Sequence, residues 1–324
     1  TSTPVPERQI NPEAHDLYLR GRYFFFSAND APGREYLEKA IQIQPDYAAA
    51  WSGLADYYGG RAVTGQDSPQ QVRANWEADA RKAVELDDSL AEAHHSMAAW
   101  YFFGEWDCKR AEAESLRAIN LNSNFGEAYH VYGYILMAEG RGAESVEAQK
   151  RALELDPMAR QWELGYSYYQ LRQFDAAINE LRLREQGNSK NLSTRFDLAA
   201  TYLAAGFGKE AVEELQQVYL VLQDKESAKA FHQAFQRGGV RAAFEWRFEQ
   251  DKAHARGKYS SPFWMAYTSA QARRKEETLR LLEDAYREHS PRLILLQNEP
   301  AFDFIRSEPR FQDLVRKMGL SGTQ

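Results

Sequence analysis

Residues 126–157 read GEAYHVYGYILMAEGRGAESVEAQKRALELDP, and this stretch decides the fold. In its first half, Tyr129, Tyr132 and Leu136 recur at three- and four-residue spacing, which is typical of the buried face of an amphipathic helix. A Gly-Arg-Gly segment then favours a tight reversal, and a second periodic stretch ends at Pro157, because proline cannot continue a helix. One hairpin of this size cannot cover its own apolar faces, so it must stack on copies of itself.

Copies of this hairpin appear when the chain is aligned on the glycine or alanine where its two helices approach closely. A register of about 34 residues then recurs, as in helical repeat proteins. The six units span residues 14–47, 48–90, 91–125, 126–157, 158–191 and 192–225, and their small landmark residues are Gly21, Ala55, Ala98, Gly133, Gly165 and Ala199. The pattern resembles the tetratricopeptide repeat, W-x2-LG-x2-Y…A-x3-F…A…P. The resemblance implies an all-α fold, a right-handed superhelical solenoid of stacked helix–turn–helix hairpins.

Outside the six units the chain divides into three parts. Residues 1–13 are predicted to form a polar linker and a helix start, with Asn11 as the N-cap before a proline. Residues 226–290 are predicted to form degenerate hairpins of the same kind, interrupted by a Gly-Gly pair. Residues 291–324 are predicted to form the C-terminal cap and tail, with a capping helix that starts after Ser307 and stops at a glycine.

The second unit is longer than the others because it carries an insertion over residues 59–72. Three glycines and a proline in this insertion discourage regular structure, so the sequence predicts an irregular loop. Loops of this length often carry function, but a solvated spacer explains the same composition.

The two ends of the chain resemble a narrower group of proteins. The opening NPEAHDLYLRGRYFF and the closing NEPAFDFIRSEPRFQDLVRKMGL are similar to the first and last segments of tetratricopeptide regions in bacterial signalling proteins. In that group the array follows a winged-helix DNA-binding domain, a nucleotide cyclase or a serine/threonine kinase, often after one membrane helix. No motif of a winged helix, a cyclase or a kinase occurs in this sequence. The bacterial regulatory role that the resemblance implies would therefore depend on residues that are not part of this sequence.

Composition narrows the class of protein further. The hydrophobic fraction is 44% and the formal net charge is −7, with acids and bases interspersed along the predicted helices. This pattern is typical of solvated helix faces and argues against a nucleic-acid-binding surface. Cys108 is the only cysteine, so the chain forms no internal disulfide. No apolar run is long enough to insert into a membrane, and the compartment stays open: cytoplasmic, or extracytoplasmic if a membrane helix precedes Thr1.

The family's geometry implies where a ligand would bind. First helices of successive hairpins line the concave surface, and positions 2, 5, 9 and 12 of each unit point toward it. We therefore predict a ligand-binding groove formed by Tyr18, Arg22, Phe25, Asp56, His95, Phe102, His130, Tyr134, Met137, Trp162, Tyr166, Tyr169 and Phe196. Such aromatic side chains offer contact area together with a polar group. The alternative is that several of them pack within the superhelix or against the insertion.

The chemistry of this groove suggests its ligand. A site that grips a terminal carboxylate needs cationic side chains, whereas Arg22 is the one suitable cation and Asp56, Glu92 and Glu127 are acidic. We therefore expect a protein or peptide segment with apolar or aromatic groups that bears positive charge.

Catalytic and cofactor motifs are absent from the sequence. His94, His95 and His130 suggest a metal site, but adjacent histidines on a helix point about 100° apart, so at most one of the pair shares a face with His130. We therefore expect neither a metal nor a cofactor. Cys108 is interpreted as a packing or surface residue rather than a nucleophile.

The sequence thus predicts a non-enzymatic module that binds a protein or peptide, as the sensor or assembly part of a bacterial transcriptional regulator or signalling protein. Two alternatives remain open. One is a structural scaffold for homo-oligomerisation through exposed helix faces, and the other is the regulatory part of a kinase or nucleotide cyclase.

Overall fold

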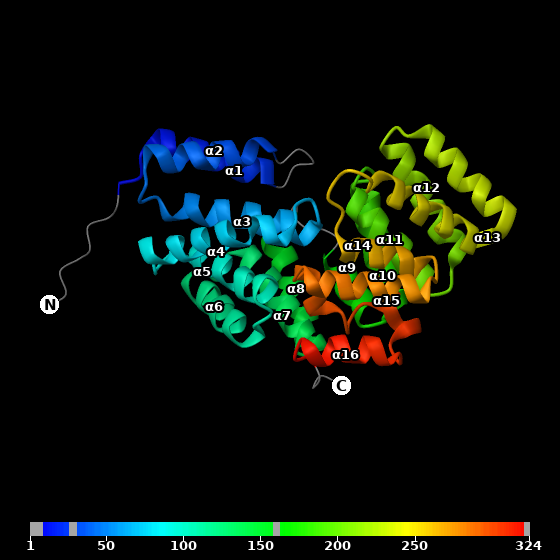
Figure 1. The fold of residues 1–324 in the computed structure, drawn as a ribbon. Helices are drawn as coiled ribbons and strands as arrows, with labels where there is room; N and C mark the ends of the chain where they lie inside the picture. Colours follow the sequence, from blue (N-terminus) through cyan, green and yellow to red (C-terminus); the bar gives the residue numbers. More distant parts are fainter. Residues whose placement is uncertain (1–8, 26–30, 158–162, 321–324) are drawn as a thin grey trace.

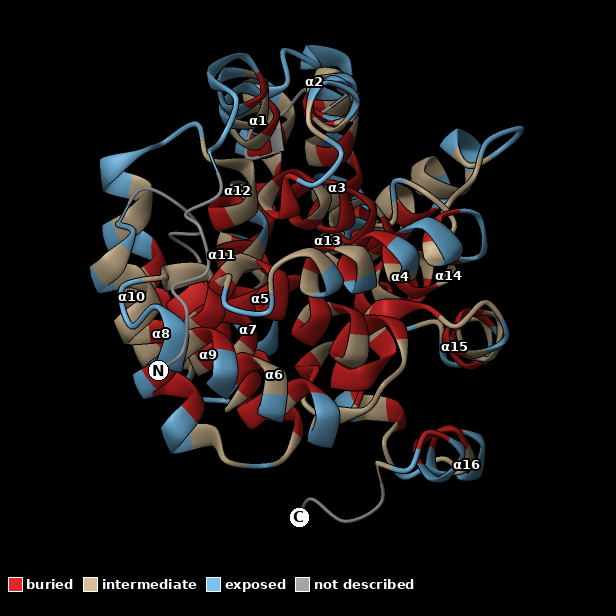
Figure 2. Cartoon of the chain, turned by 90° about the vertical axis from the view of Figure 1, so that its left-hand side faces the viewer, coloured by how far each residue is buried: buried red, intermediate tan, exposed pale blue. Residues whose placement is uncertain are grey.

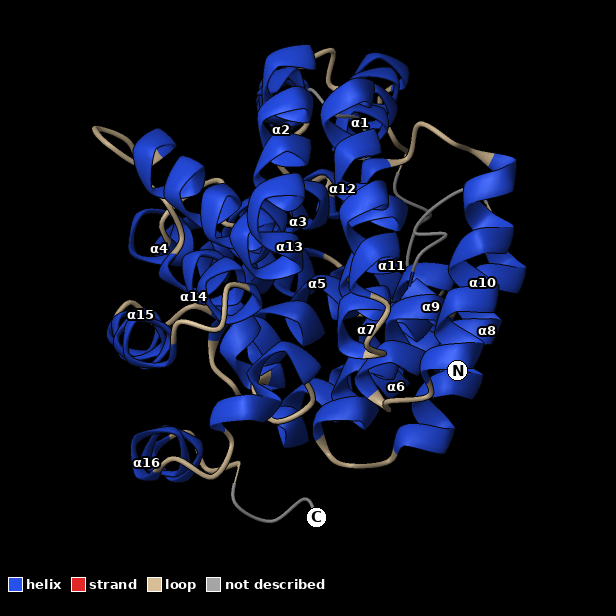
Figure 3. Cartoon of the chain, turned by 90° about the vertical axis from the view of Figure 1, so that its right-hand side faces the viewer, coloured by secondary structure: helices blue, strands red, loops and turns tan. Residues whose placement is uncertain are grey.

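The computed structural model describes residues 9–25, 31–157 and 163–320. Within them every regular element is a helix, and short loops join the helices (Figure 3). The elements are α1 (Pro12–Phe25), α2 (Ala31–Ile43), α3 (Ala48–Thr64), α4 (Pro69–Leu86), α5 (Ala91–Ala99), the π-helical turn η1 (Trp100–Gly104), α6 (Cys108–Leu121), α7 (Gly126–Ala138), α8 (Gly142–Leu155), α9 (Glu163–Gln170), α10 (Phe174–Gly187), α11 (Leu192–Ala204), α12 (Gly208–Val221), α13 (Lys225–His254), α14 (Pro262–Gln271), α15 (Lys275–Arg287), the 3₁₀ turns η2 (Pro291–Leu295) and η3 (Pro300–Ile305), and α16 (Pro309–Lys317). The predicted all-α solenoid is therefore confirmed.

Consecutive helices pair as hairpins, and the hairpins stack along the chain (Figure 1). The small landmark residues lie buried where paired helices meet. At Gly165, for example, an added Cβ would lie 2.5 Å from the side chain of Leu181 on the second helix of the same hairpin. The first helix begins where predicted, because Asn11 Oδ1 accepts hydrogen bonds from the backbone N–H groups of Glu13 and Ala14.

The insertion in the second unit is helical, which corrects the expectation of an irregular loop. Helix α3 runs on to Thr64 and α4 begins at Pro69, so only residues 65–68 lie outside helices. Glycine at position 59 serves helix packing here, because the ring of Trp76 lies 2.6 Å from where a Cβ would stand. A large ring on α4 therefore fits against a bare backbone on α3, and tertiary contact outweighs the low helix propensity of glycine.

The extended end of α3 contacts the carboxy-terminal part of the chain. The indole Nε1 of Trp264 on α14 donates a hydrogen bond to the carbonyl oxygen of Val63, 3.4 Å away. Nearby, the ring of Trp106 stacks on His289, with centroids 3.7 Å apart and planes 13° from parallel. The chain therefore folds back on itself, and α14 lies beside the end of α3 (Figure 1).

Helix α13 is two helical arms rather than one rod. Gly239 has φ +68 and ψ −161, and the ring of Phe231 lies 6.3 Å from that of Phe244 across the break. The arms therefore turn back on each other at the predicted Gly-Gly interruption. The α14–α15 hairpin follows, and α16 closes the end with Phe311 fully buried. This amphipathic last helix is the predicted capping helix.

The core has two large parts. One joins α10–α16, and the other joins α2–α9 together with Ala177 of α10 and Ala200 of α11. Figure 2 shows the buried residues gathered at the centre of the molecule. The second part also contains Ile294 and Leu295, although both come from η2 near the end of the chain. No helix among the described residues is both long enough and apolar enough to cross a membrane.

Candidate functional site on the concave face

The residues predicted to line a groove are mostly buried. Two, Tyr18 and Arg22, are partly exposed, and Phe196 is exposed under the guanidinium of Arg247. The buried ones are Asp56, His95, Phe102, His130, Tyr134, Met137, Tyr166 and Tyr169. Trp162 lies outside the described residues, as does the side chain of Phe25.

A segment near the end of the chain covers the carboxy-terminal half of these positions. We call residues 291–306 the inserted segment. Its Asn298 Nδ2 donates to the carbonyl oxygen of Met137 over 3.1 Å. Its Glu299 accepts hydrogen bonds from the hydroxyls of Tyr166 and Tyr169, over 2.9 and 2.5 Å. The predicted groove residues of α7 and α9 therefore have an intramolecular partner.

Arg292 of the inserted segment lies among aromatic rings. Its guanidinium carbon is 5.9 Å from the centroid of Tyr134, 5.4 Å from Tyr166 and 5.3 Å from the ring of Trp264. Burial raises the pKa of both tyrosines well above the ordinary value, and Arg292 opposes that rise. The arginine is therefore held by cation–π contacts in a site lined with neutral phenols.

Sequence reasoning missed the inserted segment. Its apolar run from Leu293 to Leu296 is enclosed by Pro291 and Pro300, so it is too short for a core helix. These four side chains are at most 2% exposed. A short, proline-bounded apolar run next to a predicted capping helix is the signal that would have indicated a segment buried inside the array.

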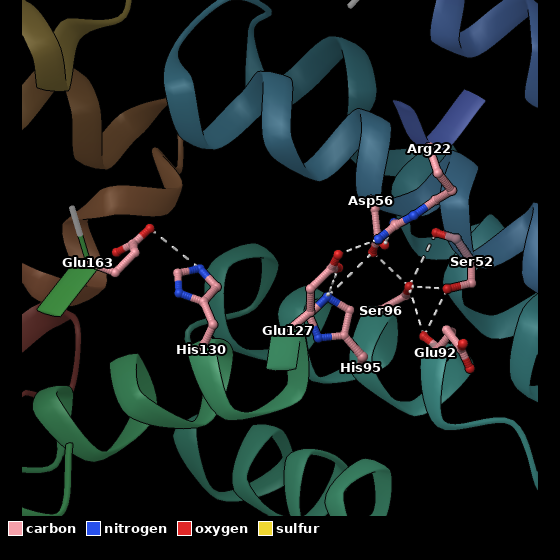
Figure 4. Close-up of polar contacts among 9 residues, drawn as sticks. All are labelled: Arg22, Ser52, Asp56, Glu92, His95, Ser96, Glu127, His130 and Glu163. Atoms are coloured by element: carbon pink, nitrogen blue, oxygen red, sulfur yellow. Dashed lines mark hydrogen bonds and ion pairs between the residues drawn. The ribbon is translucent and has the colours of Figure 1, made fainter. Parts of the chain in front are cut away.

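The amino-terminal half of the concave face is polar instead (Figure 4). Arg22 on α1 donates to Asp56 on α3 through Nη1 over 2.7 Å, and through Nη2 to Glu127 on α7. Burial of the guanidinium lowers its pKa, but the negative charges of Glu127 and Asp56 outweigh that effect and raise the pKa above its ordinary value. One arginine thus links the first, second and fourth hairpins.

Hydroxyl groups hold Asp56 in place. Ser96 Oγ donates to Asp56 Oδ1 over 2.7 Å and lies 2.7 Å from Ser52 Oγ. Ser52 Oγ also donates to the carbonyl oxygen of Glu92 over 2.8 Å. These contacts connect α3 to α5, so the carboxylate orientation is fixed by two helices.

The three histidines that the sequence suggested as metal ligands, His94, His95 and His130, lie in different environments. His94 contacts Glu114 on α6, with 2.6 Å between Nδ1 and the carboxylate. His95 points the other way, toward Asp56 and Glu127. His130 lies 3.7 Å from Glu163 on the next first helix. Adjacent histidines therefore face apart, as expected, and His130 belongs to a different cluster from His95 (Figure 4).

Cys108 begins α6, where Asp107 caps the helix by accepting from the N–H of Arg110. Burial raises the pKa of its thiol to about 12. The thiol is therefore protonated at neutral pH, which suits packing and not nucleophilic attack.

Comparison with known proteins agrees with this architecture. Residues 126–157 match the sequence model of the tetratricopeptide repeat. No curated protein matches the sequence. Among solved structures, the chain resembles the human IFIT1 dimer with m7Gppp-AAAA, with a TM-score of 0.59 and 17% identity over 93% of this chain and 74% of that one.

Two further structures are similar. Yeast Tom70 gives a TM-score of 0.53 and 14% identity over 97% of this chain and 69% of that one. The APC/C hetero-tetramer Cut9–Hcn1 gives a TM-score of 0.50 and 16% identity. The match covers 67% of this chain but only 42% of that one. At such identities the likeness concerns the fold. The chain is thus an all-helical solenoid that shares the fold of tetratricopeptide-repeat proteins.

Proposed function

We propose that this chain is a non-catalytic binding module whose recognition surface is the concave face of α1, α3, α5 and α7. The observation that carries this proposal is the division of the concave face. The inserted segment covers the side chains of α7 and α9 near their carboxy-terminal ends, whereas Tyr18, Arg22 and Glu92 keep part of their surface exposed. A partner would therefore meet the amino-terminal helices first.

The exposed groups suggest a basic partner segment. Burial raises the pKa of Tyr18 and of Tyr47, and the charge of Glu92 acts on both tyrosines and raises their pKa further. The guanidinium of Arg22 already binds two carboxylates. A ligand that carries lysine or arginine beside an aromatic residue would pair with Glu92 and stack on Tyr18. A ligand with a terminal carboxylate would meet repulsion.

Selection from a random peptide library displayed on phage tests this proposal. We expect enriched peptides to combine basic and aromatic residues, and Glu92→Lys to weaken their binding at least tenfold by reversing the charge. Glu213→Lys is the matched control, because its carboxylate is 60% exposed on α12. Equal loss in both variants, or enrichment of acidic peptides, would contradict the proposal.

A nucleic-acid partner is the alternative suggested by one structural neighbour, which holds m7Gppp-AAAA. Phosphate recognition relies on positive groups that neutralise the backbone. The amino-terminal concave face here presents Glu92, Asp56 and Glu127 around one paired arginine. We therefore propose a protein or peptide partner for this chain, and no nucleic acid.

We further propose that the module is the sensor or assembly part of a bacterial transcriptional regulator or signalling protein, including one whose catalytic kinase or cyclase domain lies elsewhere. The support is the resemblance of the chain's opening and closing segments to that group. Sequencing the gene upstream of Thr1 tests this: a winged-helix, kinase or cyclase domain is expected, and a different kind of domain would overturn it.

A homo-oligomeric scaffold is the second candidate, and α1 favours it. Leu19 is 52% exposed and Tyr23 is 72% exposed on the outer face of this helix. The pair Asp16–Arg20 lies beside them, so an antiparallel copy of α1 would find complementary charges. Light scattering of the purified chain and of Leu19→Glu decides this: a dimer that the variant dissociates supports the scaffold, and a monomer in both rejects it.

A further inference from the structure

Three side chains converge within the polar cluster of the concave face. Asp56, His95 and Glu127 come from the first helices of three consecutive hairpins, α3, α5 and α7. One potential ligand atom of each lies within 4.8 Å of the others. His95 Nε2 is 3.9 Å from Asp56 Oδ1 and 3.6 Å from Glu127 Oε2 (Figure 4).

Each carboxylate contributes different oxygens to Arg22 and to His95. Arg22 contacts Oδ2 of Asp56 and Oε1 of Glu127, whereas His95 faces Oδ1 and Oε2. The guanidinium therefore orients both carboxylates from the side opposite the imidazole. Ser96 Oγ donates to Oδ1 of Asp56 over 2.7 Å and adds a second orienting contact. Metal ligands in proteins are held by outer-shell partners of this kind.

His95 provides an independent indication of a ligand. Its side chain is 5% exposed, its Nδ1 has no hydrogen-bond partner among the described residues, and its Nε2 faces Asp56 and Glu127 at 3.9 and 3.6 Å. The distances to the two carboxylates exceed those of a hydrogen bond. Polar groups buried this deeply normally have a partner. The Nε2 edge of this buried imidazole is thus aimed between two carboxylates at distances that a shared ligand ion would bridge.

We propose that Asp56, His95 and Glu127 bind a divalent first-row transition metal ion of the zinc class. Zinc binds imidazole nitrogen and carboxylate oxygen at about 2.0–2.2 Å, so donors of a tetrahedral site lie roughly 3.4 Å apart. The two nitrogen–oxygen distances here need to shorten only slightly to reach that value. An imidazole donor favours this class over calcium or magnesium, which prefer oxygen ligands alone.

The ion would join three hairpins, because its ligands come from α3, α5 and α7. Its binding would therefore stabilise the folded array, since the unfolded chain does not assemble the three ligands. The site lies inside the proposed recognition surface but does not depend on any partner, so the metal and peptide experiments can fail independently. Sequence analysis expected no metal because it combined histidines only, and the two carboxylates come from other hairpins.

Isothermal titration of the full chain with Zn²⁺ alone, after treatment with a chelator, tests the site. We expect one equivalent to bind with a rise in Tm, and Co²⁺ to give the visible absorption of a four- or five-coordinate ion. His95→Gln and Asp56→Asn should each weaken binding at least tenfold, whereas His254→Ala, at an exposed histidine, should leave it unchanged.

Two results would overturn the proposal. One is the absence of a stoichiometric zinc site in the chain. The other is a His95→Gln variant that circular dichroism shows to be folded and that binds zinc within twofold of the original affinity. If His95→Gln does not fold, Asp56→Asn decides the question alone, because it preserves side-chain shape and removes only the charge and its metal affinity.

Discussion

The two halves of the concave face use an arginine in opposite ways. In the amino-terminal half, Arg22 links two carboxylates from other hairpins and remains 16% exposed. In the carboxy-terminal half, Arg292 lies over aromatic rings and belongs to a segment that fills the face. The first arrangement leaves polar groups within reach of a partner, whereas the second closes the surface. Equivalent positions in one solenoid can therefore stay partly exposed or be used for internal packing.

The difference arises from which part of the chain meets each half. First helices supply acidic and polar side chains to the amino-terminal half and tyrosines to the carboxy-terminal half. The hydroxyls of Tyr166 and Tyr169 donate to the carboxylate of Glu299. Both rings belong to the same core cluster as Ile294 and Leu295. The following predictions would break or sharpen this contrast, from the largest expected effect to the smallest.

Phe302→Ala should give the largest loss. The ring is fully buried and packs at 6.0 Å from the ring of Phe263. Removing it leaves a cavity and is expected to lower the free energy of unfolding by about 3–5 kcal/mol. Urea denaturation measures this. Phe207→Ala is the control, because that ring is 47% exposed and should matter far less; equal losses would contradict a packed carboxy-terminal half.

Arg22→Gln tests the amino-terminal half. It leaves the carboxylates of Asp56 and Glu127, 6% and 12% exposed, without their shared cation. We expect a loss of about 3 kcal/mol in the free energy of unfolding, because uncompensated buried charge is costly. Adding Glu127→Gln should restore much of it in a double-mutant cycle. A single variant as stable as the original chain would show that the link carries no energy.

Gly59→Ala tests whether the insertion is held by helix packing. The new methyl would meet the ring of Trp76, so we expect about 1–3 kcal/mol of destabilisation despite the better helix propensity of alanine. Thermal unfolding of Gly187→Ala provides the matched control, since nothing lies within 4 Å of that position. A gain in both variants would mean that α3 and α4 are not in close contact.

Glu299→Gln should have the smallest effect, and a pH-dependent one. Burial raises the pKa of the Glu299 carboxyl, so folding favours its protonated form. Its contribution is therefore present below the unfolded pKa, about 4.3, and is lost as the pH rises through the folded pKa. Glutamine does not titrate.

Denaturation of the original chain and of Glu299→Gln at pH 4, 6 and 8 measures this contribution. The stability of the original chain relative to the variant should fall as the pH rises. A difference that stays constant, or that grows with pH, would contradict a buried Glu299.

Much of the fold follows from the sequence because its determinants are local. Periodicity, small residues and prolines predicted the hairpins, and Asn11 and Gly319 mark helix ends as expected. The helical structure of the insertion could not be predicted, because Gly59 disfavours a helix in the sequence and its packing against Trp76 is visible only in the structure. At this position a contact that only the tertiary structure reveals outweighs the low helix propensity of glycine.

The concave site was harder to predict, because it depends on contacts between distant residues. The repeat register placed Tyr166 on the concave face, but its partner Glu299 lies 133 residues away. By contrast, the cluster around Asp56 was within reach: Arg22 and Asp56 share position 9 of their units, His95 is at position 5 and Glu127 at position 2. Aligning these acidic and basic positions across units would have assembled the cluster.

Hydrogen exchange of the free chain tests the central claim most directly, namely that the inserted segment is a permanent part of the core. The amides of Leu296 and Asn298 donate to the carbonyl oxygens of Leu293 and Leu295. We predict that both exchange only through unfolding of the surrounding core, with the same opening free energy as amides in α7. Exchange through an opening several kcal/mol easier would contradict the account, because the inserted segment would then be a displaceable cover over a larger groove.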